Sequence, residues 1–209
     1  MVKEGYKFGV PPLVLGLGAL LPGWYWAAGL LIFLGLFTFY FFRDPDRTPP
    51  PDPDAVVSPG DGRVVVITDE AFEGTPGRRI SVFLSVWDVH VNRSPFAGKI
   101  SRMEYKPGRF YAAMRARASA ENEQNVFYLE TDRGLLVFKQ IAGWIARRVV
   151  SWKQPGATVG TGERIGMIRF GSRMDVWLPI EAEIVVKKGQ FVAAGSSVLA
   201  RWPKGKDTR

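Results

Sequence analysis

The longest uncharged run in the chain, residues 8–42, limits the fold more than any other feature of the sequence. As one straight helix it would measure about 52 Å, well beyond the hydrocarbon core of a bilayer at about 30 Å. Pro22 and Gly23 interrupt the run and leave two segments, 8–21 and 24–42. The second is long enough to cross a bilayer, whereas the first could cross or re-enter. The sequence therefore predicts a hydrophobic helical hairpin with one or two spans.

The residues around this run predict how it meets a membrane. Three aromatic residues lie at the break, where amphipathic rings sit at the headgroup level: Trp24, Tyr25 and Trp26. Basic residues flank the run at both ends: Lys3, Lys7, Arg43 and Arg47. Positive charge at both ends predicts that both ends are cytoplasmic. A cleaved signal peptide is a poorer account, because the run is too long and lacks a small-residue cleavage site near its end. We expect residues 1–43 to anchor the protein in the cell membrane, with the rest on the cytoplasmic side.

The chain after the run divides into a linker and a β-rich domain. Residues 44–54 are rich in proline and aspartate, which predicts a stiff, extended linker. Residues 55–209 are numerous enough to bury a core. Short segments rich in β-branched and aromatic residues predict strands at 64–67, 80–84, 126–129, 135–138 and 175–178. Only residues 110–117 suggest a short helix, so we expect a mainly β catalytic domain.

Two pairs of repeats refine this prediction. The pattern S-P-x-x-G-[RK]-[VI] occurs at 58–64 and 94–100, and G-x-x-V-x-x-G-x-x-[IV] occurs at 156–165 and 189–198. Biotinyl and lipoyl carrier domains resemble these patterns, and two copies of each predict a barrel-sandwich with pseudo-twofold repeats. A carrier function is not expected, because no hairpin here supplies an acceptor lysine.

Composition excludes several classes of site. The chain has no cysteine and one histidine, which rules out disulfides, thiolate zinc sites, a cysteine nucleophile and a multi-histidine metal site. We expect no bound metal. The net charge of +8 favours an acidic partner, either nucleic acid or the anionic face of a bilayer.

Three residues are candidates for chemistry, and each has a plainer structural interpretation. Asp61 lies in a P-G-D-G turn, for which turn formation is an equally good account. His90 is the only side chain with an unperturbed pKa near neutrality, although a lone histidine beside valines is more often structural. Ser172 follows Gly171 in what is usually just a turn, and the G-x-S-x-G pattern of ordinary serine hydrolases is absent.

Taken together, these residues belong to a larger series of short blocks. The blocks are F-F-R-D-P at 41–45, S-P-G-D-G at 58–62, D-V-H-V-N-R at 88–93, Y-x-x-G-x-F at 105–110, E-N-E at 121–123, A-R-R at 146–148 and F-G-S-R-M-D-V at 170–176. In this order, from about residue 41 to 198, they resemble the short form of the phosphatidylserine decarboxylase proenzymes. The resemblance implies a carboxy-lyase of phospholipid biosynthesis that converts phosphatidylserine to phosphatidylethanolamine.

The resemblance also implies self-processing. The Gly171–Ser172 bond would be cut through attack by the serine hydroxyl, an N-to-O acyl shift and β-elimination, which leaves a covalent pyruvoyl group derived from Ser172. This group would form a Schiff base with the substrate amine, without a metal or a diffusible cofactor. The fragments 1–171 and 172–209 would remain together as a heterodimer. Asp61 would orient the base for cleavage, and His90 is the candidate acid that protonates the product.

The sequence departs from longer relatives at one position. Those relatives carry H-x-x-H, and here the two positions are His90 and Arg93. Arginine cannot act as a base at accessible pH, so His90 serves both steps or cleavage uses another base. Arg147 and Arg148 are candidates for recognising the lipid phosphate. A strand would turn only one of these neighbours inward, and a solvated strand edge is an equally good account.

Other functions remain open at this stage. The substrate could be another serine phospholipid, such as an archaetidylserine. A different class is a non-catalytic, membrane-anchored barrel-sandwich adaptor, which would keep one intact chain. Basic residues at 114–117 and 204–209 suggest nucleic-acid binding, but they match no recognition motif, and we expect no nucleic acid. The sequence leaves higher oligomers open.

Overall fold

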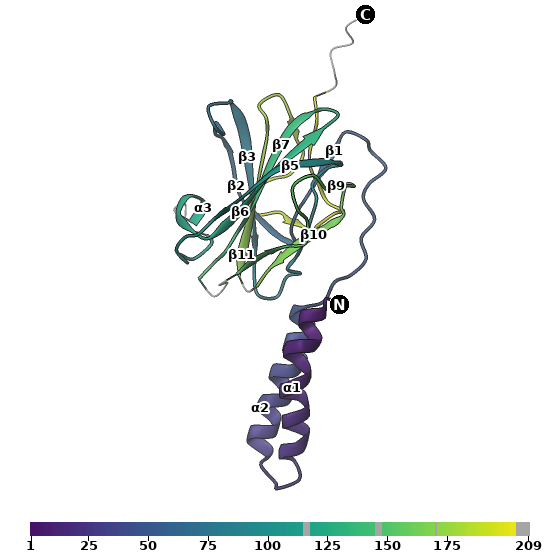
Figure 1. Cartoon of the computed structure of the whole chain (residues 1–209), viewed down its shortest axis with the longest axis vertical. Helices are drawn as coiled ribbons and strands as arrows, with labels where there is room; N and C mark the ends of the chain where they lie inside the picture. Colours follow the sequence, from purple (N-terminus) through teal and green to yellow (C-terminus); the bar gives the residue numbers. More distant parts are fainter. Residues whose placement is uncertain (115–117, 145–147, 170, 204–209) are drawn as a thin grey trace, which may run out of the picture. The chain divides into compact units, whose positions relative to one another are not determined.

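The computed structural model describes residues 1–114, 118–144, 148–169 and 171–203. The chain forms two compact units, Met1–Asp46 and Arg47–Arg209 (Figure 1). The first unit is helical, and the second is built mainly from β-strands. The mainly β class predicted for the larger part of the chain is confirmed.

The first unit is a hairpin of two helices, α1 (Lys3–Ala19) and α2 (Tyr25–Phe41). The turn between them contains the expected Pro22-Gly23 break, and Gly23 has a φ of +80°. Glycines allow the helices to pack closely, because a Cβ on Gly16 would lie 2.9 Å from the backbone nitrogen of Ile32. The helix α1 begins earlier than the expected segment 8–21, and it contains Pro11 and Pro12.

The lengths of these helices bear on the expected membrane span. Each helix has 17 residues, so the expected segment 24–42 forms a slightly shorter helix. Within the residues described, neither helix combines the length and the apolarity that crossing a membrane requires.

The second unit is built from antiparallel strands in three sheets. The described strands are β1 (Ala55–Val57), β2 (Gly62–Asp69), β3 (Gly77–Leu84), β4 (Val91–Arg93), β5 (Gly98–Lys106), β6 (Gln124–Thr131), β7 (Gly134–Ile141), β8 (Val149–Ser151), β9 (Thr158–Val159), β10 (Arg164–Ile168), β11 (Ser172–Pro179), β12 (Glu183–Ile184), β13 (Phe191–Val192) and β14 (Val198–Arg201). The largest sheet has the order β13-β2-β3-β11-β7-β6-β5-β9 and curls into a half-barrel (Figure 1). Two three-stranded sheets, β1-β14-β12 and β4-β10-β8, complete the unit.

All five predicted strand segments lie within longer strands, namely β2, β3, β6, β7 and β11. The helix predicted at 110–117 is wrong for the residues that the structure describes. Both the amide and the carbonyl of Tyr111 bond to the side chain of Asn122, at 2.9 and 2.8 Å, so they are not available to a helix. A single short helix, α3 (Ala118–Glu121), follows instead.

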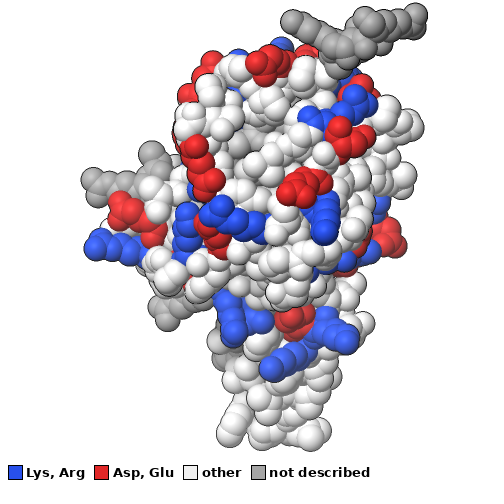
Figure 2. All heavy atoms as spheres, turned by 45° about the horizontal axis from the view of Figure 1, so that its top comes forward, with Lys and Arg blue, Asp and Glu red and all other residues white. Residues whose placement is uncertain are grey.

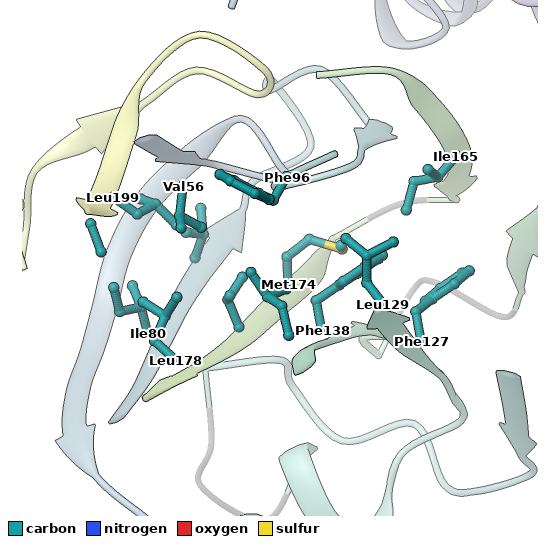
Figure 3. Packing of buried hydrophobic residues seen from close by; sticks show 14 of the residues in the cluster. Val56, Ile80, Phe96, Phe127, Leu129, Phe138, Ile165, Met174, Leu178 and Leu199 are labelled. Atoms are coloured by element: carbon teal, nitrogen blue, oxygen red, sulfur yellow. The ribbon is translucent and has the colours of Figure 1, made fainter. Parts of the chain in front are cut away.

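The core lies on the inner face of the curled sheet. Its members include Ile80, Phe127, Phe138, Met174 and Leu199 (Figure 3). The rings of Phe127 and Phe138 stack with centroids 4.8 Å apart. Side chains alternate along β11, so Met174, Val176 and Leu178 point into the core. The residues between them face the other side of the sheet.

The repeated segments make matching hydrogen bonds. The amide of Gly195 donates to the carbonyl of Ser58, and the amide of Gly162 donates to the carbonyl of Ser94. Each of these two hydrogen bonds is 2.8 Å long. Each serine hydroxyl donates to the carbonyl two residues further on, at 2.6 and 2.7 Å. The two glycines have φ values of +74° and +73°, which L-residues rarely adopt. The two copies therefore fold alike locally.

Candidate active site

Ser172 is the first residue of β11, which lies between β3 and β7 in the middle of the largest sheet. It pairs with Leu84, the last residue of β3. Ser172 is fully buried, and its Oγ makes no hydrogen bond with any described residue. The preceding Gly171 has a φ of +46°, a left-handed conformation that favours glycine. The serine hydroxyl is thus enclosed directly after a residue whose left-handed backbone suits glycine.

Gly143 lies directly against the carbonyl of Gly171. A Cβ built on Gly143 would come within 1.9 Å of that carbonyl oxygen. Only a glycine at this position leaves room for the peptide bond that precedes Ser172. Sequence reasoning missed Gly143, because nothing local separates it from the other glycines among the 23 in the chain.

His90 is buried in the loop between β3 and β4. Its Nδ1 lies 2.9 Å from the backbone carbonyl oxygen of Asp88. A carbonyl only accepts, so Nδ1 carries the hydrogen, and Nε2 holds the lone pair of the neutral ring. The Asp88 carboxylate accepts a 2.7 Å bond from the amide of Ser85, which fixes the loop. The imidazole is therefore held in the tautomer that can take up a proton at Nε2.

The loop that carries His90 follows β3, the strand that pairs with the start of β11. It begins directly after Leu84, the partner of Ser172. At its other end, the carbonyl of His90 accepts a 3.2 Å bond from the amide of Ile168, the last residue of β10. The loop of the histidine thus starts beside Ser172, at the same end of the sheet, and a joint role of the two side chains stays a prediction.

Asp61 is buried in the turn before β2. Its Oδ1 accepts a 2.7 Å bond from the amide of Ala194, and its Oδ2 accepts a 3.0 Å bond from the guanidinium of Arg47. These bonds tie the turn to the loop after β13 and to the proline-rich linker. The hydrogen bond to the imidazole of His90 that is described above involves the carbonyl of Asp88 and not Asp61. The orienting role of Asp61 stays a prediction.

Arg93, which is predicted from the sequence to lie at the position of a second histidine, makes a structural contact. Arg93 is buried, and its guanidinium donates a 3.0 Å bond to the carbonyl of Gly162. Its side chain also packs against Gly195, where an added Cβ would lie 2.7 Å from the Arg93 Cδ. Arg93 thus joins the two left-handed glycine turns of the repeats.

Of the two arginines predicted to recognise phosphate, the structure describes only Arg148. Arg147 lies outside the described residues. Arg148 is exposed just before β8, and its carbonyl accepts a 3.3 Å bond from the amide of Arg169. Because Arg169 closely precedes Gly171, Arg148 is linked to the segment that leads into the predicted cleavage point.

A buried ionic network lies on the outer face of β11, directly after Ser172. Arg173 donates from Nε to Asp175 at 2.5 Å and from Nη2 to the Ser81 hydroxyl at 2.8 Å. Ser119 of α3 donates to the same carboxylate at 2.7 Å. Both partners of the ion pair are almost inaccessible to solvent. Sequence reasoning missed this network, which fixes the first residues of β11 after Ser172.

Lys139 lies on the same outer face. Its ammonium group is 4.7 Å from the ring centroid of Trp177. Burial lowers the pKa of Lys139, while the nearby Asp175 carboxylate opposes the shift.

Acidic and basic side chains are interspersed on the face of the β-rich unit seen in Figure 2. Basic charge is therefore not gathered into one patch on that face.

A cavity of about 510 Å³ lies towards the other end of β11. It is lined by Phe72, Val137, Trp177, Leu178 and Pro179, among other residues. Since Ser172 and Pro179 are the two ends of the strand, this cavity is separate from the site around Ser172.

Comparison with known proteins identifies the family of the chain. The family model for phosphatidylserine decarboxylase matches residues 34–200. A phosphatidylserine decarboxylase proenzyme of Solibacter usitatus (strain Ellin6076) is 52% identical over 181 residues, covering 84% of this chain and 86% of that protein. The proenzyme of Novosphingobium aromaticivorans is 45% identical over 213 residues, covering 94% and 84%. That of Symbiobacterium thermophilum is 42% identical over 209 residues, covering 98% and 96%. The chain therefore belongs to the phosphatidylserine decarboxylase family.

Proposed function

We propose that this protein cuts its own chain between Gly171 and Ser172 and then decarboxylates phosphatidylserine to phosphatidylethanolamine with a pyruvoyl group. The observation that carries the proposal is the buried Ser172 hydroxyl, which follows a left-handed glycine and bonds to no described residue. The names of the relatives as phosphatidylserine decarboxylase proenzymes support both the reaction and the processing.

Cleavage begins when Ser172 Oγ attacks the carbonyl carbon of Gly171. The new C–O bond replaces the C–N bond, and the amine of Ser172 takes the proton that Oγ loses. A base removes this proton, and His90 Nε2 is the candidate. Negative charge develops on the Gly171 oxygen, beside Gly143, and must be stabilised there.

The ester then gives the pyruvoyl group. Loss of the Ser172 α-proton breaks the Cβ–O ester bond and releases the carboxylate of Gly171. Water then replaces the nitrogen of Ser172, which leaves as ammonia. The surroundings fit such a group, because the serine atoms that become it are buried and Oγ has no competing bond to a described residue. The pyruvoyl carbonyl supplies the electron sink for decarboxylation.

The chain's own residues supply the remaining steps. His90 delivers the proton that replaces carbon dioxide on the product, while Asp61 holds the neighbouring turn. Arg147 and Arg148 bind the lipid phosphate. The fragments 1–171 and 172–209 stay together, because β11 keeps its hydrogen bonds to β3 and β7 after the cut.

We also propose that the helical hairpin seats the enzyme in the cell membrane. Its large apolar side chains are exposed within the unit, including Leu15, Leu21, Trp26 and Leu30. Exposed apolar surface of this kind is characteristic of contact with lipid. The basic residues that flank the hairpin favour a cytoplasmic catalytic unit.

The repeats support a further structural proposal. We infer that the β-rich unit is a barrel-sandwich of biotinyl and lipoyl type, with two halves related by a pseudo-twofold axis. The matched bonds of Ser58 and Ser94 to Gly195 and Gly162 are the supporting observation.

Intact-mass analysis of purified protein tests the proposed function. We expect two fragments, 1–171 and 172–209, with a carbonyl on the second that reacts with hydrazine. The Ser172→Ala variant should stay intact and release no carbon dioxide from phosphatidylserine vesicles. Ser101→Ala is the matched control and should be processed normally, because Ser101 is exposed. An intact chain with full decarboxylase activity would disprove the mechanism.

A further inference from the structure

Three buried amide side chains form a hydrogen-bonded chain on the inner side of the sheet. Asn125 Nδ2 donates to Gln140 Oε1 at 3.1 Å. Gln140 Nε2 in turn donates to Asn92 Oδ1 at 2.9 Å and to the carbonyl of Val150 at 3.3 Å. Asn92 and Gln140 are fully buried, and Asn125 is 4% exposed. No step of the proposed mechanism uses these residues.

The bond to Val150 fixes which way the amides point. A backbone carbonyl only accepts, so the Gln140 atom that faces it must be Nε2. Asn92 must then present its oxygen to Gln140. The remaining atom, Asn92 Nδ2, is buried and bonds to no described residue. Buried donors without a partner are rare in native proteins, which points to a ligand that is absent here.

Strand register brings Gln140, the middle member of this amide chain, close to the candidate active site. Gln140 pairs with Met174 on β11, and Ser172 lies two residues before Met174 on the same inner face. Side chains related diagonally in this way are about 7–8 Å apart or less. Asn92 also lies in β4, which begins directly after His90. The amide chain therefore joins the strand of Ser172 to the segment of His90.

We propose that the Asn92 side-chain amide binds the carboxylate of the substrate's serine headgroup. This inference rests on the proposed function. The headgroup amine must reach the position of Ser172, and the carboxylate is attached to the carbon next to that amine. Asn92 Nδ2 is a buried donor joined by one hydrogen bond to Gln140, the diagonal neighbour of Ser172, and we assign the carboxylate to it.

The neutral amide suits a carboxylate that has to leave. An arginine or lysine would stabilise the ionised ground state, which is lost when carbon dioxide forms. A neutral NH2 group orients the carboxylate with less ground-state stabilisation. The product lacks the carboxylate, so it loses this bond, and Asn92 then discriminates between substrate and product.

A binding measurement tests the site without turnover. Processed enzyme is treated with borohydride to reduce its terminal ketone, and short-chain phosphatidylserine and phosphatidylethanolamine are titrated by calorimetry. Asn92→Ala should weaken binding of the serine lipid by about tenfold and leave the ethanolamine lipid unchanged. Equal effects on both lipids, or no effect, would overturn the proposal. Gln190→Ala removes an exposed amide and should change neither affinity.

A second variant keeps the contact with Gln140. Asn92→Asp keeps the oxygen that accepts from Gln140 and exchanges the NH2 group for the second oxygen of a carboxyl group. Burial raises the pKa of this carboxyl group. When protonated it can donate, and when ionised it repels the headgroup carboxylate. The preference for phosphatidylserine should therefore fall as pH rises in this variant, but not in the wild type. A preference independent of pH in the variant would contradict the assignment.

The two proposals fail in different ways. If intact mass shows cleavage at Ser172 and Asn92→Ala keeps the wild-type lipid preference, only the carboxylate site is wrong. If the wild type is neither cleaved nor active, the proposed function is wrong and this inference falls with it.

Discussion

The imidazole of His90 is oriented by the hydrogen bond that its Nδ1 donates to the backbone carbonyl of Asp88. Such an arrangement leaves Nε2 as the nitrogen that moves a proton. Arg93, at the position where a second histidine is expected in longer relatives, donates to the carbonyl of Gly162 and stays charged at accessible pH. We therefore expect one histidine to serve both cleavage and decarboxylation.

The His90→Ala variant tests this dual role. We expect it to remain an uncleaved proenzyme, with cleavage slowed by about 100-fold or more, because the base is lost. Time-resolved intact mass measures the cleavage. Asp61→Asn, which alters the candidate orienting carboxylate, should slow the same step. Normal cleavage of His90→Ala with little release of carbon dioxide would limit His90 to decarboxylation.

Gly143 gives a second prediction at this scale. Gly143→Ala should strongly slow self-cleavage, because its Cβ would collide with the Gly171 carbonyl and displace the bond to be cut. Gly160→Ala is the matched control, since a Cβ there would meet nothing closer than 3.8 Å. Both variants are compared by intact mass and thermal unfolding. A normally processed Gly143→Ala would show that this close approach is unimportant for cleavage.

Among the elements, β11 carries both an inner serine and an outer ion pair. Arg173→Met should lower the free energy of unfolding by up to about 3–5 kcal/mol, because the buried Asp175 loses its closest cationic partner and keeps the longer, 3.3 Å ion pair with Arg79. Chemical denaturation of the uncleaved Ser172→Ala background measures this effect. The exposed pair of Arg78 and Asp69 supplies the control, and Arg78→Met should have little effect. Equal effects of the two substitutions would contradict the importance of burial.

The elements also show how far the sequence could lead. Five of the fourteen described strands were predictable, because their short apolar segments are bounded by turn residues, whereas β5 and the shorter strands were missed. The helix predicted at 110–117 failed because Asn122, from a later segment, captures the backbone of Tyr111. Strand order and register were beyond reach, since they depend on pairing between distant segments.

The same limit applies to the candidate site. Ser172, His90 and Asp61 stood out because they lie in recognisable blocks of sequence. Their roles are still predictions. Gly143 and Asn92 are singled out by contacts with residues distant in the sequence, and no local sequence pattern marks them. Register supplies this information, because it places Gln140 opposite Met174 and so links Asn92 to the strand of Ser172.

For the whole molecule, the division into two compact units predicts separable roles. Deleting residues 1–43 should move the protein from the membrane fraction to the soluble fraction. Cleavage should continue, because Ser172 and the residues around it all belong to the second unit. Fractionation and intact mass measure the two outcomes. A wash of the full-length protein in high salt should not release it, and release would indicate an electrostatic attachment instead.

The central position of β11 has a consequence for maturation in the cell. Ser172 becomes enclosed only when β3 and β7 have paired with the strand on either side. If self-cleavage needs this enclosure, the reactive carbonyl appears only in chains that have finished folding. Maturation then follows first-order kinetics at any protein concentration and acts as a checkpoint. Chains that misfold never expose a reactive ketone to the amines of the cell.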